Sequence, residues 1–447
     1  EGAFTSPSAV EQALSRAHSA YGRWREVTLD ERSARVARFV ELAVEDVDAI
    51  ASELTMQIGR PHKDGGGEAQ GWLDRGRTMI SLADEALADT RLDPRPGFTR
   101  FIRKEPLGVV MILAPWNYPW LTAVNALVPA LMAGNTVVLK HSEQTPLVAE
   151  RIAQAAREAA LPAGVLEVLH IDHDAVQEVI ADPRVAYVAF TGSVDGGRAV
   201  QRAAAGRFIG VGLELGGKDP AYVRPDVDAD ETAASLVEGA FYNAGQSCCA
   251  VERIYVHRDV LGGFVDAFAH HTRQLVLGDP RDTNTTLGPV VRKRNAQAIQ
   301  LQIDDAIARG ARNLIDPAHY DATSRGLPYM APTVLVDVDH TMAIMREETF
   351  GPAVGIMAVR DDAEAIARMN DSRYGLTASI WTRDAERAEA IGNRVQTGTC
   401  FMNRCDYLDP ELAWVGVKDS GRGCSLSSLG YQQLTRPKSF HLRLGPT

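Results

Sequence analysis

Two adjacent cysteines, Cys248 and Cys249 in the stretch GQSCCA, are the side chains of this sequence best suited to nucleophilic chemistry. A thiol acts as a nucleophile when it is accessible, is helped to ionise and lies near a group that stabilises an oxyanion. The residues alone do not rank one cysteine above the other. In an extended backbone the two side chains would point in opposite directions, so only one would face a given substrate.

Two polar residues elsewhere could assist such a thiol. Glu214 lies in LELGG, an apolar stretch where burying a carboxylate is costly unless the group is paired or used. Asn117, in PWNYP, carries a carboxamide that can donate to a developing alkoxide. A strand-end acid paired with a surface lysine and an ordinary turn asparagine remain alternatives for these two residues.

Composition narrows the class of protein. The chain has 447 residues, 45% of them hydrophobic, which is enough for two or three domains. A net charge of −11 without any basic block indicates no nucleic-acid partner. The five cysteines show neither a disulfide framework nor the CxxC spacing of a zinc site, so we expect reduced thiols, no metal and a cytoplasmic enzyme. The sequence shows no secretory signal and no apolar run long enough to span a membrane.

The elements that must position these residues follow an alternating pattern. Capping-box patterns at Ser8–Glu11 and Thr28–Glu31 predict helices near the N-terminus. Apolar runs predict buried strands of a parallel sheet at 108–114, 136–140, 165–171 and 185–190. Thr145-Pro146 begins a helix, and its inner face should consist of Val148, Ile152, Ala155, Ala156 and Ala159.

This alternation predicts a doubly wound nucleotide-binding fold, followed by a second α/β region from about 217 to 419. No G-x-G-x-x-G motif follows the first strand. Lys140 and Glu143 come just after a strand, where such folds bind their ligand. Ser193 begins a helix after FTG, so its N–H and hydroxyl could face a pyrophosphate.

Seven short strings occur in a distinctive order: PWNYP (115–119), GNTVVLKHSE (134–143), FTGS (190–193), LELGGK (213–218), GQSCC (245–249), EETFGP (347–352) and MNRCDY (402–407). In this order they resemble the NAD(P)-dependent aldehyde dehydrogenase superfamily, from about residue 30 to the C-terminus. The resemblance implies an α/β fold with three parts. These are a doubly wound NAD-binding domain (1–87 and 107–215), an α/β catalytic domain (216–419) and a small β oligomerisation element (88–106 and 420–447).

The resemblance also assigns roles to residues. It makes Cys248 the nucleophile, Asn117 an oxyanion-hole donor together with the Cys248 backbone N–H, and Glu214 the base that activates water. Lys140 and Glu143 would hold the adenine-side ribose, Glu348 the nicotinamide-side ribose, and Phe350 would pack near the nicotinamide. The remaining cofactor-binding positions are Trp116, Gly192, Ser193 and Leu215. The substrate tunnel would be lined by Tyr118, Thr122, Asn125, Tyr242, Leu408 and Trp414.

The chain departs from the commoner family pattern at three places. His141 replaces the proline of K-P-S-E, Asn125 and Ala126 stand where many members carry a tryptophan and a lysine, and Ala413–Gly416 replaces P-F-G-G. A proton relay through that lysine is therefore absent. These departures leave the three proposed catalytic residues unchanged. They argue against assigning this chain the substrate of any one family member.

We therefore predict NAD-dependent oxidation of an aldehyde to its acid through a thioacyl-enzyme on Cys248. Glu143 should favour NAD over NADP because its carboxylate would repel a 2′-phosphate, and Lys140 should soften this bias so that NADP is still accepted. The aromatic, uncharged tunnel set favours an apolar or aromatic aldehyde. Arg404 keeps a carboxylated semialdehyde as the alternative.

Three other functions remain as alternatives. One is a CoA-acylating relative, which would not need Glu214. Another is a binding protein without turnover, which would not need the set of Cys248, Glu214 and Asn117. The third is a plain cysteine hydrolase, which leaves the nucleotide-binding half unexplained. The segments 98–106 and 435–443 resemble the oligomerisation strands of the family. They predict a homodimer or homotetramer, because unpaired edges there would be a liability.

Overall fold

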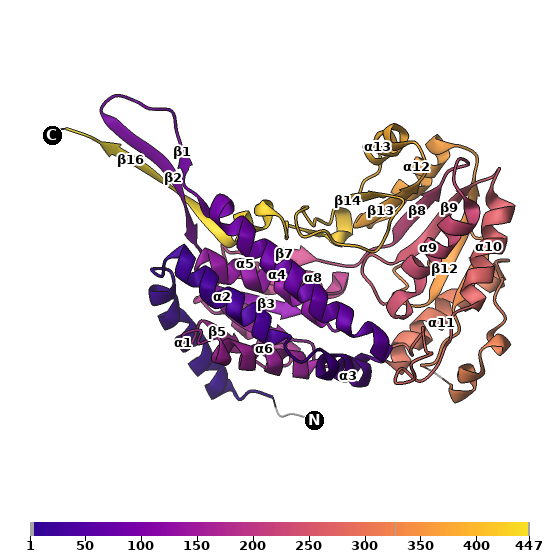
Figure 1. The fold of residues 1–447 in the computed structure, drawn as a ribbon, viewed down its shortest axis with the longest axis horizontal. Coiled ribbons are helices and arrows are strands. Elements are labelled where there is room, and N and C mark those ends of the chain that lie inside the picture. Colours follow the sequence, from indigo (N-terminus) through magenta and orange to yellow (C-terminus); the bar gives the residue numbers. More distant parts are fainter. Residues whose placement is uncertain (1–3, 327, 446–447) are drawn as a thin grey trace.

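The structure, a computed structural model, describes residues 4–326 and 328–445, and its named strands form three sheets (Figure 1). The first sheet has six strands in the order β15-β7-β6-β3-β4-β5, all parallel except β15. Its strands are β3 (Val109–Ala114), β4 (Thr136–His141), β5 (Leu166–Val168), β6 (Val185–Thr191), β7 (Gly210–Glu214) and β15 (Gly421–Arg422).

The predicted strands of this sheet are confirmed, with one difference in length. All six residues of β3 and of β4 are buried, as continuous apolar runs predict for strands covered on both faces. The run 165–171 contributes only the three residues of β5. At the edge of the sheet the chain then turns toward α7, whose N-cap is Asp172.

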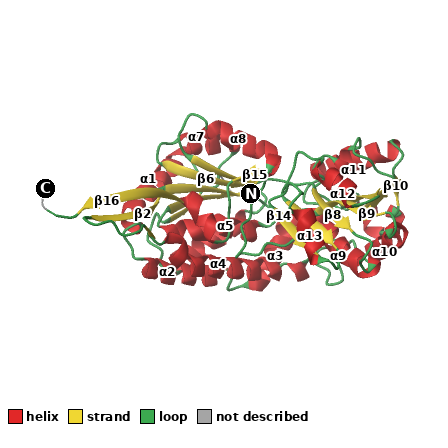
Figure 2. Ribbon diagram, turned by 90° about the horizontal axis from the view of Figure 1, so that it is seen from above, coloured by secondary structure: helices red, strands yellow, loops and turns green. Residues whose placement is uncertain are grey.

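Helices cover both faces of the first sheet (Figure 2). One face packs against α2 (Leu29–Ala43), α4 (Gly66–Leu87), α5 (Pro119–Ala133) and α6 (Pro146–Glu158). The other packs against α7 (His173–Ala181) and α8 (Val194–Ala204), while α1 (Pro7–Trp24) contributes to both cores. The predicted inner face of α6 is buried at all five positions. Alternate residues of β3 explain the two cores, because Ile112 belongs to one and Met111 to the other.

The predicted helix starts are partly correct. Thr28 accepts a hydrogen bond from the Glu31 N–H at 3.3 Å and caps α2, as predicted. The prediction at Ser8 was wrong, because α1 begins at Pro7 and its N-cap is Ser6. Thr145 does occupy the N-cap of α6, but its side chain makes no capping hydrogen bond. Its buried hydroxyl has no hydrogen-bond partner among the described residues.

The second sheet has seven strands in the order β10-β11-β12-β9-β8-β13-β14, parallel except for β10. They are β8 (Asp219–Val223), β9 (Val251–His257), β10 (Arg312–Asn313), β11 (Thr333–Val336), β12 (Ala353–Val359), β13 (Thr377–Trp381) and β14 (Thr399–Met402). One face packs against α9 (Ala229–Phe241) and α10 (Leu261–Arg273). The other packs against α11 (Lys293–Ala308), α12 (Asp362–Asn370) and α13 (Ala385–Gly392). The helix α3 (Val47–Ile58) lies outside these two layers and packs on α4.

The third sheet is an antiparallel arm that projects away from the rest of the molecule (Figure 1). It consists of β1 (Thr90–Arg91), β2 (Phe98–Pro106) and β16 (Thr435–Arg443), and β2 and β16 pair along their whole length. Phe101 stacks on Phe440 with ring centroids 4.5 Å apart. The short β15 lies in the segment predicted for the oligomerisation element but pairs with β7. The predicted domain bounds stay a proposal, and their outermost residues, 1–3 and 446–447, lie outside the described residues.

The residues of the short strings that suggested a function lie at the ends of strands of the two larger sheets. Asn117 follows β3, Ser193 follows β6 and Glu214 ends β7, all at the carboxyl edge of the first sheet. Cys248 precedes β9 and Glu348 precedes β12, both at the amino edge of the second sheet. Within the part of the chain that the structure describes, no helix is both long enough and apolar enough to span a membrane.

His141, which stands where the commoner pattern has a proline, makes the stability of the fold depend on pH. Its side chain is 2% exposed, and neither ring nitrogen has a hydrogen-bond partner among the described residues. Burial lowers the pKa of His141 from 6.5 to about 3. Between these two values the unfolded state binds a proton that the folded state does not, so stability falls as the pH falls.

We predict that His141→Leu flattens the acid dependence of stability. The buried imidazole should cost the wild type about 2 kcal/mol between pH 7 and pH 5, at roughly 1.4 kcal/mol per pH unit below the unfolded pKa. Thermal or urea unfolding of the two proteins across this range measures the difference. His18→Gln, at an exposed position of α1, is the control. Parallel pH profiles for wild type and His141→Leu would contradict the prediction.

Candidate active site

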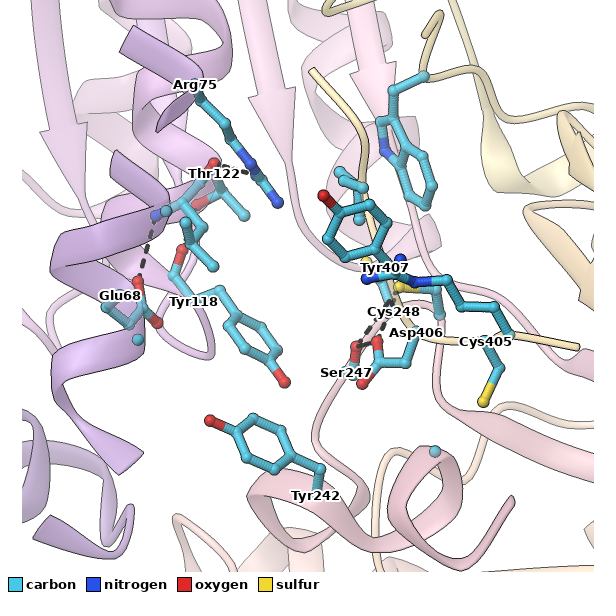
Figure 3. Close-up of a pocket in the computed structure, with 18 of the residues that line it drawn as sticks. Glu68, Arg75, Tyr118, Thr122, Tyr242, Ser247, Cys248, Cys405, Asp406 and Tyr407 are labelled. Carbon is cyan, nitrogen blue, oxygen red and sulfur yellow. Dashed lines mark hydrogen bonds between the residues drawn. The ribbon is translucent and has the colours of Figure 1, made fainter. Parts of the chain in front are cut away.

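A cavity of about 610 Å³ lies between the two larger sheets, and Cys248 and Glu214 both line it. Figure 3 shows Cys248 among the side chains around this cavity. The side chains that line it come from α4, α5, the end of β7, α9, the loop before β9, and the segment after β14. All six residues predicted to contact substrate line this Cys248 cavity, namely Tyr118, Thr122, Asn125, Tyr242, Leu408 and Trp414. Leu215, predicted to contact the cofactor, lines it as well.

The two cysteines lie in different environments. Cys248 is partly exposed, whereas Cys249 is buried, with 2% of its surface accessible. The Cys249 Sγ donates to Asp406 Oδ1 at 3.0 Å. A hydrogen bond with Cys248, burial and the negative charge of Asp406 hold the pKa of Cys249 well above its usual value. Cys249 therefore remains a neutral thiol, and Cys248 is the better-placed nucleophile.

Asp406 anchors this end of the cavity. It accepts from Ser247 Oγ at 2.7 Å as well as from Cys249, and it comes from the loop after β14 (Figure 3). Burial raises the pKa of Asp406. The residues on both sides of Cys248 hydrogen-bond to this one carboxylate. The loop before β9, which carries the nucleophile, is therefore held in place by the loop after β14.

Glu214 is surrounded by donors at the end of β7. Thr191 Oγ1 donates to its Oε2 at 3.0 Å, and Ser425 donates to Oε1. Burial raises the pKa of Glu214, while Ser425, Thr191, Arg75 and Asn125 act in the opposite direction. A carboxyl group with a raised pKa can take a proton from water near neutral pH, which is what a general base requires.

Asn117 is held beside the loop that carries Cys248. Its Nδ2 donates to the Gln246 carbonyl oxygen at 3.1 Å, which leaves the second N–H of the carboxamide free to donate. Asn117 does not itself line the cavity, although its neighbour Tyr118 does. Residues 243–245, just before this loop, all have positive φ angles, which is unfavourable for Asn243 and Ala244.

A buried ion pair fixes both loops. Arg60 and Glu68 are 2% and 1% exposed, and their Nη1 and Oε1 atoms are 2.6 Å apart. Arg60 Nη2 donates to the backbone carbonyl of Asn117 at 2.6 Å, and its Nε donates to Asn243 Oδ1 at 3.2 Å. The second carboxylate oxygen of Glu68 accepts from the N–H groups of Trp120 and Leu121, at the start of α5.

The residues predicted to bind the adenine half of a cofactor lie at the carboxyl edge of the first sheet. Lys140 is buried near the end of β4, burial lowers its pKa, and Glu143 is exposed three residues on. Gly192 and Ser193 precede α8, but Ser193 Oγ accepts from the Gly196 N–H at 3.1 Å and so caps its own helix. The backbone of the first turn of α8 remains suited to a phosphate.

The residues predicted to bind the nicotinamide half lie at the amino edge of the second sheet. Glu348 accepts from the Gly217 N–H at 3.2 Å, and a side chain at Gly216 would collide with its carboxylate. Burial and the nearby Glu252 raise the pKa of Glu348 to about 8. The ring of Phe350 meets that of Trp116 edge-on at 5.6 Å. A carboxyl group and two aromatic side chains therefore lie where the sequence predicted the nicotinamide half of a cofactor.

Sequence reasoning missed several residues of the site: Arg60, Glu68, Arg75, Ser247, Asp406, Thr191 and Ser425. The helical period of α4 could have revealed two of them. Its buried face contains Glu68, Ala69, Trp72, Arg75, Gly76 and Met79, so Glu68 and Arg75 are charged residues on an otherwise apolar face. No sequence signal identifies the partners of Asp406 or Ser425, since these contacts join distant segments.

Comparison with known proteins identifies relatives over nearly the whole chain. The model of the aldehyde dehydrogenase family matches residues 3–440. A succinate-semialdehyde dehydrogenase [NADP(+)] of Mycolicibacterium paratuberculosis is 34% identical over 97% of this chain and 92% of that protein.

Two solved structures show the same fold. The succinic semialdehyde dehydrogenase of Streptococcus pyogenes, in complex with NADP+, is 30% identical, covers 99% of this chain and 97% of its own, and has a TM-score of 0.94. The NAD-dependent aldehyde dehydrogenase of Sinorhizobium meliloti is 32% identical, with coverages of 99% and 88% and a TM-score of 0.93.

We predict that the two cysteines differ sharply on substitution. Cys248→Ala should abolish aldehyde oxidation and still bind the cofactor, because it removes only the nucleophile. Cys249→Ala, the matched control one residue on, should keep activity within about tenfold, since a neutral buried thiol contributes packing and one hydrogen bond. Steady-state rates and a cofactor titration measure both. Loss of activity in Cys249→Ala together with retention in Cys248→Ala would reverse the assignment.

Proposed function

This chain belongs to the aldehyde dehydrogenase family, and we propose that it oxidises an aldehyde that carries a carboxylate, such as succinic semialdehyde, to the acid. It is an NAD(P)-dependent aldehyde dehydrogenase. The observation that carries the proposed chemistry is the placement of Cys248 and Glu214, both partly exposed, on one cavity.

The substrate proposal reverses the order of preference that the sequence suggested. Both a curated relative and a solved structure of high similarity are named for succinic semialdehyde, which supports the carboxylated alternative over an apolar or aromatic aldehyde. Arg404 lies at the cavity with its guanidinium 3.4 Å from the ring centroid of Tyr407. The aromatic side chains of Tyr118, Tyr242 and Trp414 keep an apolar or aromatic aldehyde as the second candidate.

The steps follow from the residues of the cavity and from Asn117, which is held beside the loop that carries Cys248. Cys248 attacks the aldehyde carbon, and the free N–H of the Asn117 carboxamide stabilises the oxyanion, an effect commonly worth about 3 kcal/mol. A nicotinamide cofactor, which Trp116, Glu348 and Phe350 would hold, would supply the hydride acceptor, and loss of the hydride would leave a thioacyl group on Cys248. Glu214 then takes a proton from water, and the resulting attack releases the acid.

Glu214 also favours hydrolysis over transfer to CoA. Transfer to a thiol does not need a base that activates water, whereas this chain surrounds Glu214 with Thr191, Ser425 and Asn125. We therefore propose free acid as the product. A binding protein without turnover would not need this arrangement, and a hydrolase would leave the cofactor edge of the first sheet without a role.

We propose that both nicotinamide cofactors are accepted. The named relatives include NADP-dependent and NAD-dependent enzymes. Lys140 and Glu143 supply one charge of each sign at the same strand end, and the exposed Glu143 can move away from a 2′-phosphate. We keep the expectation that NAD is preferred, because a carboxylate that accepts from a 2′-hydroxyl would be repelled by the phosphate.

The arm supports the proposal of a homodimer or homotetramer. Its strands β2 and β16 form a narrow sheet that extends beyond the two cores, and most residues of β16 are exposed (Figure 1). Long exposed edges of this kind are usually covered in the native assembly. Light scattering that found only a 48.5 kDa species at micromolar concentration would contradict this proposal.

The substrate proposal is tested by a panel of aldehydes without added CoA. Succinic semialdehyde should exceed hexanal and benzaldehyde in kcat/KM by at least about tenfold with either cofactor, which is the selectivity that one added ionic contact can supply. The acid and the reduced cofactor should form in equal amounts. Higher kcat/KM for hexanal or benzaldehyde would favour the second candidate, and a requirement for CoA would exclude hydrolysis.

The role of Glu214 is tested by Glu214→Gln. Acylation does not need the base, so one equivalent of reduced cofactor should form per site, and later turnover should slow by roughly 10²–10⁴-fold. Hydroxylamine should speed release of the stalled thioester as a hydroxamate. Glu238→Gln, at an exposed acid of the same cavity, is the control and should still turn over repeatedly. Stopped-flow traces without a burst would mean that Glu214 activates the thiol instead of water.

A further inference from the structure

Arg75 is a buried cation in the wall of the Cys248 cavity. It lies on the inner face of α4, is 8% exposed, and points toward the cavity in Figure 3. Other buried arginines are well satisfied: Arg60 pairs with Glu68, and Arg253 donates to backbone carbonyls and a hydroxyl. Arg75 is different, because it has no carboxylate within 4.0 Å among the described residues and, unlike Arg253, engages only one of its three nitrogens.

Only one nitrogen of Arg75 is engaged. Its Nη1 donates to the Leu121 carbonyl at 2.6 Å and to Asn125 Oδ1 at 3.2 Å. Among the described residues no acceptor binds Nε or Nη2, so three of its five N–H groups are left for other partners. A buried guanidinium without a counterion is costly, and an anion that enters the cavity would relieve this cost.

The position of Arg75 relative to the reacting groups suits one end of a short substrate. Burial lowers the pKa of Arg75, while the charges of Glu68, Glu214, Cys249 and Cys248 each raise it. Arg75 and these groups all line the same cavity. The substrate carbonyl must lie at Cys248, so a carboxylate a few bonds away could reach the free edge of Arg75 within the same cavity.

The surrounding acids do not neutralise Arg75. Glu68 is taken up by Arg60 and two backbone N–H groups. Glu214 accepts from Thr191 and Ser425 and forms no ion pair with Arg75 among the described residues. Asp406 accepts from Ser247 and Cys249, and Figure 3 shows it across the cavity from Arg75. Asp74, the neighbour of Arg75, is exposed and accepts from Gln70.

We propose that Arg75 binds the carboxylate of the aldehyde substrate through its free Nε and Nη2 donors, with Asn125 holding the guanidinium in place. The inference rests on the proposed function and assigns its selectivity to a buried residue of α4. It differs from the expectation drawn from the sequence, in which Arg404 was the reason to consider a carboxylated substrate. Arg404 is exposed and stacks on Tyr407, so water screens its charge.

The test compares succinic semialdehyde with methyl 4-oxobutanoate, which has the same chain and no charge. The wild type should favour the acid, and Arg75→Gln should lower the ratio of the two kcat/KM values by at least about 30-fold, as expected when one partner of a buried charge pair is removed. Arg75→Lys should restore part of the ratio. Arg77→Gln, which removes an exposed arginine of the same helix paired with Glu41, should leave the ratio unchanged.

Each result separates the proposals. No preference for the acid in the wild type would overturn the substrate proposal and this inference together. A wild-type preference that persists in Arg75→Gln but is lost in Arg404→Gln would overturn the role of Arg75 alone. If Arg75 only positions Asn125 and Glu214, both substrates should lose activity equally, which would also overturn the inference. Activity of Arg75→Gln on the ester shows that the variant is folded, and weaker competitive inhibition by succinate would support the loss of a carboxylate site independently.

Discussion

The buried pair of Arg60 and Glu68 is the interaction on which the geometry of the site depends. It joins three segments that are distant in sequence: the end of α3, the turn before α5 and the loop before β9. A buried pair of this kind contributes little net stability, but loss of one partner typically costs about 3–5 kcal/mol because the other charge remains unpaired. Its value here is positional, since Arg60 holds both the Asn117 carbonyl and the strained Asn243.

The pair of Arg60 and Glu68 matters for the site because the catalytic residues come from two different sheets. The carboxyl edge of the first sheet supplies Asn117 and Glu214, and the amino edge of the second supplies Cys248. The relative positions of residues on two separate cores depend on how rigid the contacts between those cores are. Hydrogen bonds from Ser247 and Cys249 to Asp406 fix the same loop from the opposite side.

The sequence predicted the parts of this arrangement that are local or repetitive. Continuous apolar runs identified β3, β4 and β6, and the inner face of α6 followed from its helical period. The short strings marked Cys248, Glu214 and Asn117 because their resemblance to a known family does not depend on contacts. The sequence did not reveal Arg60 or Asp406, whose importance arises only when distant segments fold together. The unpaired imidazole of His141 was visible as a departure from the family, but its burial was not.

The charges around the Cys248 cavity explain how a substrate would be oriented. Asp406 lies beside the nucleophile and raises the pKa of Cys249, and an ionised Asp406 would repel a second carboxylate. Arg75 lies on the wall formed by α4 and has free donors. A carboxylated aldehyde would therefore enter with its carboxylate toward α4 and its carbonyl toward Cys248. Asp406, which raises the pKa of Cys249, would thus also disfavour a substrate bound with its carboxylate toward Asp406. Attraction at Arg75 and repulsion at Asp406 would favour the same orientation of the substrate.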